Sequence, residues 1–115
     1  MRQAEYSERR TLERHSIPLK VFDRETGALL GCSENINAGG LMLVSTDPIP
    51  TMNEIQIWIE LPGEEAADKI EMTAFTAWSS FSDSRPIYYC TGFHFVDPAE
   101  DKLDRIQTFI DGQSS

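Results

Sequence analysis

The strongest structural constraint in this sequence is a segment in which apolar and other residues alternate strictly, from Ile55 to Leu61. Isoleucine or leucine occupies every second position, and Gln56, Trp58 and Glu60 fill the positions between them. Because successive side chains of a β-strand point to opposite faces, this pattern predicts a strand with one buried and one outward face. Such a strand needs neighbouring strands to satisfy its backbone hydrogen bonds.

Five further segments have the composition of strands and are separated by turn residues such as Gly, Asp, Asn and Pro. They are residues 17–22, 28–35, 41–44, 70–79 and 87–96. In the fourth segment we expect Thr76 and Trp78 to share one face with Ile70. In the last, His94 alternates with Phe93, so we expect an exposed histidine on a strand.

The period changes to that of a helix after residue 96. Asp97 is expected as the N-cap, Pro98 as the first helical residue and Gly112 as the C′ residue that ends the helix. Its apolar stripe consists of Leu103, Ile106, Phe109 and Ile110. The prediction is therefore an all-β-dominated fold: a flexible arm over 1–16, a six-stranded antiparallel barrel over 17–96 and a C-terminal helix over 97–112.

Charge is distributed unevenly along the chain. The net charge is −9, yet residues 1–15 contain four arginines against three glutamates, and the other residues contain six basic and sixteen acidic side chains. This balance argues against nucleic-acid binding through a general basic field. The N-terminal segment is the locally cationic part of the chain.

Several other classes of protein are not supported by the sequence. No apolar run is long enough to span a membrane and no secretory signal is present, so we expect a cytoplasmic protein. Cys32 and Cys90 lack the neighbours of a zinc or disulfide framework and are interpreted as small strand residues. With only two histidines and no glycine-rich phosphate loop, we expect neither an enzyme nor a cofactor or metal site.

Two segments have the chemistry of a binding site. Arg10 and Arg14 are four residues apart, and guanidinium groups pair bidentately with phosphate or with the edge of guanine. Residues 35–40, with the sequence Asn-Ile-Asn-Ala-Gly-Gly, combine amide side chains with glycines that allow positive φ or close approach of another group. The alternative for the arginines is a solvated face with weak ion pairs to Glu8 and Glu13.

Together these segments resemble the PilZ domain family, receptors for the bacterial second messenger cyclic di-GMP. The likeness extends from about residue 7 to residue 110, as one domain. Residues 10–14 match the family's RxxxR motif and follow a further Arg9, residues 35–40 align with [D/N]xSxxG, and residues 92–95 are similar to its late GxxF.

The resemblance implies a PilZ-type, split-barrel-like fold whose arm is mobile in the free protein and folds over the ligand. It implies a ligand site made of Arg9, Arg10, Arg14, Asn35, Asn37, Gly39 and Gly40. An arginine just before RxxxR is similar to members that hold a stacked pair of ligand molecules. With no second domain visible, the output is expected to pass to a protein partner in trans.

Asn37 departs from the pattern, because the family usually has serine there. An asparagine amide can donate to the same ligand groups but is larger. The alternative function is therefore a degenerate family member that does not bind cyclic di-GMP and acts as a constitutive protein-interaction module.

Overall fold

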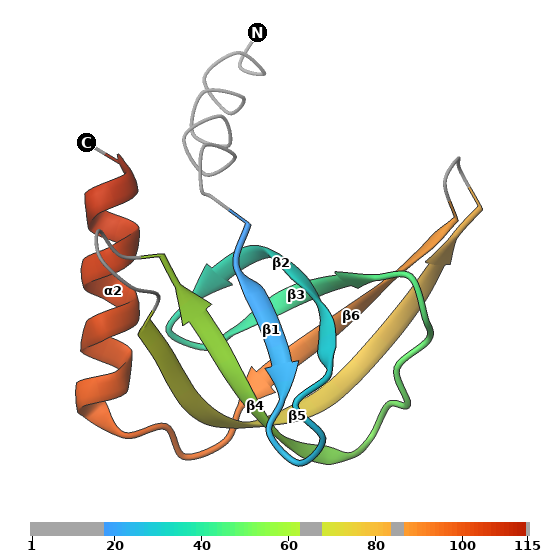
Figure 1. The fold of residues 1–115 in the computed structure, drawn as a ribbon, viewed down its shortest axis with the longest axis horizontal. Coiled ribbons are helices and arrows are strands. Elements are labelled where there is room, and N and C mark those ends of the chain that lie inside the picture. The colour runs from blue at the N-terminus through green and yellow to red at the C-terminus, as the bar shows by residue number, and fades with distance from the viewer. Residues whose placement is uncertain (1–17, 63–67, 84–86, 115) are drawn as a thin grey trace, which may run out of the picture.

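The structure is a computed structural model that describes residues 18–62, 68–83 and 87–114, without the side chains of 68, 113 and 114. The described residues form six strands followed by one helix (Figure 1). They are β1 (Lys20–Asp23), β2 (Leu29–Asn37), β3 (Gly40–Ser45), β4 (Glu54–Leu61), β5 (Asp68–Ser82), β6 (Tyr88–Phe95) and α2 (Glu100–Ser114).

The six strands form a closed antiparallel barrel in the order β1-β2-β3-β6-β5-β4. β1 closes it, pairing with β2 on one side and with β4 on the other. β4 and β5 pair in unbroken register from Glu54 opposite Phe75 to Leu61 opposite Asp68. The prediction of a six-stranded antiparallel barrel with a C-terminal helix is confirmed.

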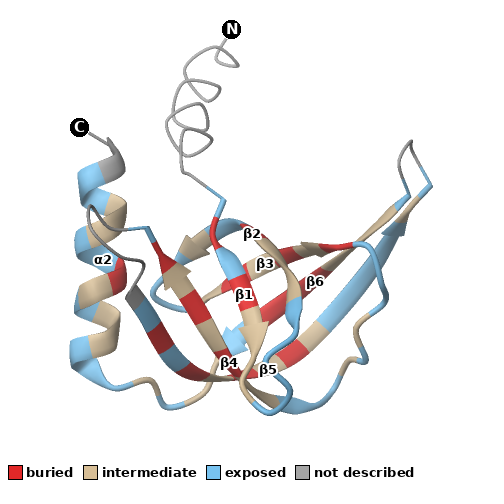
Figure 2. Ribbon diagram, viewed as in Figure 1, coloured by how far each residue is buried: buried red, intermediate tan, exposed pale blue. Residues whose placement is uncertain are grey.

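Buried positions recur along the strands of the barrel (Figure 2), and they are the positions that the alternation predicts for the core. Its buried members are Leu19, Val21, Leu41, Leu43, Ile57, Ile59, Leu61, Ile70, Met72, Ala74 and Phe93, joined by Ile106 from the helix. Burying a Leu, Ile or Phe side chain contributes about 1.5–3 kcal/mol each, so this cluster is the main source of stability. Cys32 and Cys90 are free thiols on strands, as expected.

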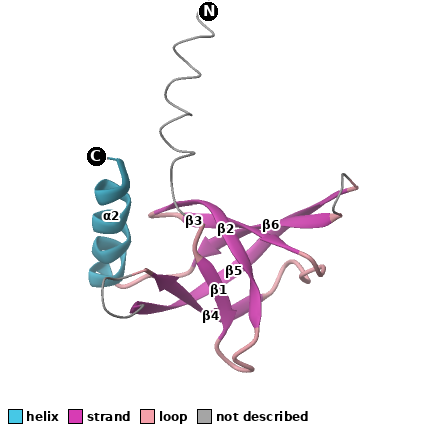
Figure 3. Ribbon diagram, turned by 45° about the horizontal axis from the view of Figure 1, so that its top comes forward, coloured by secondary structure: helices cyan, strands magenta, loops and turns pink. Residues whose placement is uncertain are grey.

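Helix α2 lies beside one end of the barrel, on the side away from the projecting β5–β6 hairpin (Figure 3). Ile106 is buried, and Phe109 and Ile110 pack against the core, so three members of the expected stripe are confirmed. The fourth, Leu103, is half-buried and is not among the residues packed against this core. Both expected helix ends are wrong. Asp97 has a left-handed φ of 44°, and the carbonyl of Ala99 accepts the first helical bonds. Gly112 lies inside the helix, which continues to Ser114, and lacks the left-handed conformation of a C′ residue.

A bulge in β5 changes the direction of Trp78. The β5–β6 register shifts between Thr76 and Trp78. Thr76 and Ile70 are both fully buried, but Trp78 is 45% exposed, so the prediction that Trp78 shares their face is wrong. An extra residue on one strand of a pair reverses the alternation beyond it. As a result Trp78 lies on the outer surface of the barrel.

Candidate functional site

The turn between β2 and β3 is held by the side chain of Asn37. Its Oδ1 accepts hydrogen bonds from the backbone N–H groups of Gly39, at 2.8 Å, and Gly40, at 3.2 Å. A short asparagine side chain bonded to backbone two residues on is a common turn-forming arrangement. The N–H of Phe95 donates to the carbonyl of Gly39 at 3.0 Å, which fixes the turn on β6.

Two glycines on neighbouring strands allow close packing at this place. Neither Gly39 nor Gly40 has positive φ, so the turn does not need glycine for that reason. A Cβ on Gly40 would be 2.0 Å from the carbonyl oxygen of Phe93, and a Cβ on Gly92 would be 2.1 Å from Nε1 of Trp78. The close approach expected for the glycine pair therefore applies to Gly40.

Beside this turn the outer surface is hollowed into a groove of about 320 Å³, within the usual range of small-molecule sites. Strands β2, β3, β5 and β6 and the β2–β3 turn contribute to it. Its lining residues are Asn35, Asn37, Gly39, Gly40, Leu41, Met42, Trp78, Gly92, Phe93 and His94. We refer to this set as the groove.

The indole of Trp78 is the largest aromatic surface in the groove. One part of the ring packs against Gly92, opposite it in the β5–β6 register, while nearly half of the side chain stays exposed. An aromatic ring held in this way on a glycine can offer a face to a planar group. Nucleobases stack on such rings with little dependence on sequence.

The groove differs in charge from the rest of the molecule. The chain carries nineteen acidic side chains, yet none is among the described residues that line the groove. His94 is the one ionisable side chain in this lining. Asn35 is exposed, and its side chain makes no hydrogen bond to a described residue, so its amide is available to a ligand. The groove therefore suits an anionic or neutral polar molecule.

Four of the seven predicted ligand residues lie in the groove: Asn35, Asn37, Gly39 and Gly40. The other three, Arg9, Arg10 and Arg14, lie outside the described residues. Sequence reasoning missed Trp78, because the bulge cannot be seen in the alternation, and it found His94 only as an exposed strand residue. Gly92 was noticed only within the GxxF resemblance, although a strand glycine is a signal of close approach.

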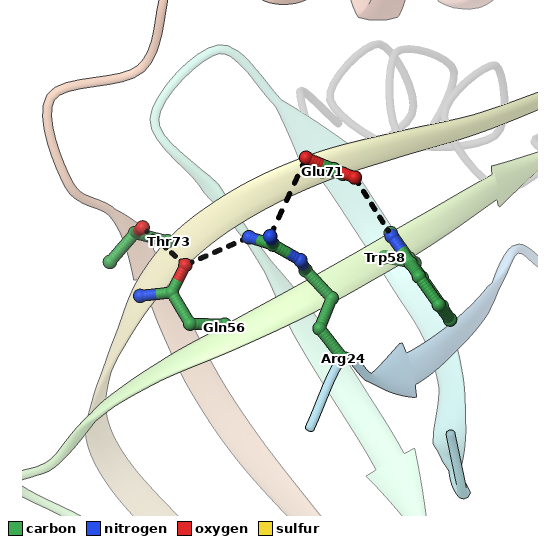
Figure 4. Close-up of polar contacts among 5 residues, drawn as sticks. All are labelled: Arg24, Gln56, Trp58, Glu71 and Thr73. Carbon is green, nitrogen blue, oxygen red and sulfur yellow. Dashed lines mark hydrogen bonds and ion pairs between the residues drawn. The ribbon is translucent and has the colours of Figure 1, made fainter. Parts of the chain in front are cut away.

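A second polar cluster lies on the outer surface formed by β4 and β5 next to the end of β1 (Figure 4). We refer to Arg24, Gln56, Trp58, Glu71 and Thr73 as the Arg24 cluster. Arg24 Nη1 and Thr73 Oγ1 each donate to Gln56 Oε1 at 2.9 Å. Glu71 Oε2 accepts from Trp58 Nε1 at 3.5 Å, and Glu71 Oε1 forms an ion pair with Arg24 Nη2, also at 3.5 Å. The polar groups of the Arg24 cluster therefore find their hydrogen-bond and ion-pair partners within the cluster.

Other groups with possible chemistry offer less. Burial raises the pKa of the Cys90 thiol, and the negative charge of Glu34 raises it further. The thiolate is the nucleophilic form of cysteine, so a raised pKa makes Cys90 a weak nucleophile. Among the described residues no cluster of three His, Cys, Asp or Glu side chains could hold a metal ion. In the same residues no helix has the length and apolarity needed to cross a membrane.

Comparison with known proteins shows relationships at the level of structure. No protein-family model matches the sequence, and no curated protein matches it. The structure of the Bacillus subtilis inhibitor of motility (MotI/DgrA) has a TM-score of 0.68 and 23% identity, over 84% of this chain and 47% of that one. The Borreliella burgdorferi PlzA protein in complex with c-di-GMP has a TM-score of 0.54 and 14% identity, over 95% of this chain and 50% of that one.

This chain therefore spans about half the length of each of these two proteins. Identities this low show a shared fold, and both likenesses support the PilZ-like barrel that the sequence motifs imply.

Proposed function

We propose that this protein is a receptor for cyclic di-GMP that binds the nucleotide in the groove. The observation that carries the proposal is the composition of the groove. Although the chain has a net charge of −9, the lining of the groove contains no carboxylate. It does contain an exposed tryptophan and four residues of the second motif. The likeness to PlzA, whose structure is a complex with c-di-GMP, supports the same ligand.

The groups in the groove match those of the ligand. Cyclic di-GMP has two guanines and two phosphates, so it needs a stacking surface and hydrogen-bond donors. Trp78 supplies the surface. The amides of Asn35 and Asn37 supply donors. The Oδ1 of Asn37 is engaged in the turn, and its NH₂ group remains as a donor on a residue that lines the groove.

Positive charge has to come from elsewhere, because the groove lining contains no arginine or lysine. Arg10 and Arg14, with Arg9, are the cationic groups of the RxxxR motif and would complete the site by pairing with phosphate and with guanine edges. Their segment closes over the groove when the ligand binds. The closed form then presents a changed surface to a protein partner in trans, without turnover of the nucleotide.

The alternative of a degenerate, non-binding member was motivated by Asn37. The hydrogen bonds of Asn37 favour the receptor instead. Its Oδ1 caps the β2–β3 turn, and a serine hydroxyl can make the same kind of bond more weakly. Asparagine is thus compatible with the turn geometry that the motif requires.

Isothermal titration calorimetry of the full chain with cyclic di-GMP tests the proposal. We expect saturable binding at ligand concentrations up to ~100 μM, where a Kd of about 1 μM is easily measured. Arg10→Ala and Arg14→Ala should each weaken binding about 5- to 150-fold, since a bidentate guanidinium contact contributes about 1–3 kcal/mol. Arg2→Ala, in the same segment but outside the motif, is the matched control and should bind as the parent does.

Absence of binding by the parent chain would contradict the receptor function. Binding gained only in Asn37→Ser would support the degenerate alternative. Recovery of cleaved nucleotide after incubation with the purified protein would contradict the proposal that it is not an enzyme.

A further inference from the structure

His94 occupies a position in the groove that neither sequence motif includes. It lies on β6 directly opposite Gly40 of β3 and opposite Phe75 of β5. Phe93, the residue before it, is buried in the barrel, so His94 points to the outer surface, where it is exposed and lines the groove with Asn35 and Asn37. Its imidazole has no hydrogen bond to any described residue and is available to a bound molecule.

We propose that His94 is a further ligand-binding residue of this groove, whose ring N–H donates to an anionic oxygen of the bound nucleotide and whose protonation strengthens binding. This inference rests on the proposed function. Histidine is the side chain whose charge commonly changes near neutral pH, and a charged donor makes a stronger hydrogen bond to phosphate than a neutral one. Protonated His94 would add positive charge where the described lining has none.

The strands around His94 contain few charged groups that could mask the effect of its protonation on ligand binding. Strand β3 contains no ionisable side chain over its whole length, and the β5 residues in this part of the sheet are Phe75 and Trp78. On β2, Glu34 is exposed but is not part of the groove lining, and the same holds for Asp97 after β6. Within the described lining of the groove, His94 is therefore the one side chain that could bring a positive charge to a ligand.

The experiment is calorimetric titration of the full chain with cyclic di-GMP at about pH 6 and about pH 8. We expect the parent to bind roughly threefold to tenfold more tightly at the lower pH. His94→Gln keeps a hydrogen-bond donor but cannot titrate, so it should bind equally at both pH values. His15→Gln is the matched control: His15 is the only other histidine of the chain and adjoins Arg14. This variant should keep the pH dependence.

Several outcomes would overturn the assignment of His94, and they can be distinguished from a failure of the receptor function. A parent that binds equally at both pH values, or a His94→Gln variant that keeps the difference, removes His94 from the site but leaves the receptor function standing. A parent that binds at neither pH overturns both proposals.

NMR gives a readout independent of affinity. The imidazole signal of His94, assigned by its loss in His94→Gln, should shift on ligand addition, and an unchanged signal contradicts the contact. Equal thermal midpoints of parent and variants confirm that folding is unaffected.

Discussion

The groove and the Arg24 cluster are two polar surfaces on the outside of the same barrel, and they differ in where their hydrogen bonds go. In the Arg24 cluster, Gln56 accepts two hydrogen bonds, and Glu71 accepts one and forms an ion pair with Arg24. Nζ of Lys69 lies 4.8 Å from the ring centroid of Trp58. In the groove, the side chains of Asn35 and His94 make no hydrogen bond to a described residue.

This difference teaches how to separate a structural cluster from a binding surface. Partly buried polar groups that bond to one another have little left to offer a ligand, whereas exposed donors around a hollow keep their capacity. Each surface also contains one tryptophan: Trp58 donates to Glu71, while Trp78 makes close contact with a glycine. If the difference is functional, substitutions in the groove will affect binding, and equivalent ones in the Arg24 cluster will not.

The largest effect is expected at Gly40. In Gly40→Ala the added methyl group would clash with the carbonyl of Phe93, so β3 and β6 have to separate where the groove forms. Overpacking of this kind costs about 1–3 kcal/mol, and we expect that loss in the free energy of unfolding together with loss of ligand binding.

Urea denaturation and calorimetry measure the two effects. Gly39→Ala is the matched control, because its methyl group meets only Asn37 Oδ1, at 3.4 Å, and it should change stability by less than about 0.5 kcal/mol. Equal losses in both variants would mean that the turn, rather than the packing of Gly40, is the sensitive element.

A large effect on affinity alone is expected for Trp78→Ala. Stacking of one base on an aromatic side chain contributes about 1–3 kcal/mol, so affinity for cyclic di-GMP should fall about 5- to 150-fold. Stability should change little, because the side chain is 45% exposed. Trp58→Ala is the control and should leave affinity unchanged. If it weakens binding as much as Trp78→Ala does, the Arg24 cluster belongs to the site.

Most of the barrel could be predicted from the sequence, because burial of one strand face imposes period-two patterning directly. Ile57 and Ile59 are fully buried, as their alternation indicates. The helix ends could not be predicted in the same way. Asp97 has the chemistry of an N-cap, but the tertiary turn after β6 places it in a left-handed conformation, and the helix begins three residues later.

Half of the candidate site was also accessible from sequence, as the second motif lines the groove. Trp78 was not accessible, since a strand pattern carries no information on a bulge that arises from pairing with a distant strand. The position of His94 beside Gly40 likewise depends on the β3–β6 register, because these two residues are more than fifty apart in the chain.

The smallest effect is expected in the Arg24 cluster. The ion pair of Arg24 and Glu71 spans 3.5 Å between side chains that are 32% and 53% exposed, so solvent screens it. Such pairs contribute about 0–1 kcal/mol, and Glu71→Gln should lower the free energy of unfolding by no more than that. Arg24→Met also removes the hydrogen bond to Gln56 and should lower the free energy of unfolding slightly more.

Urea denaturation of both single variants and the double variant gives the coupling energy of Arg24 and Glu71, which should shrink as salt is added. Calorimetry should show that these variants bind cyclic di-GMP as tightly as the parent does, because the polar groups of the cluster already bond to one another. If a variant binds more weakly while its stability is unchanged, a surface whose polar groups bond to one another can still bind ligand in this fold.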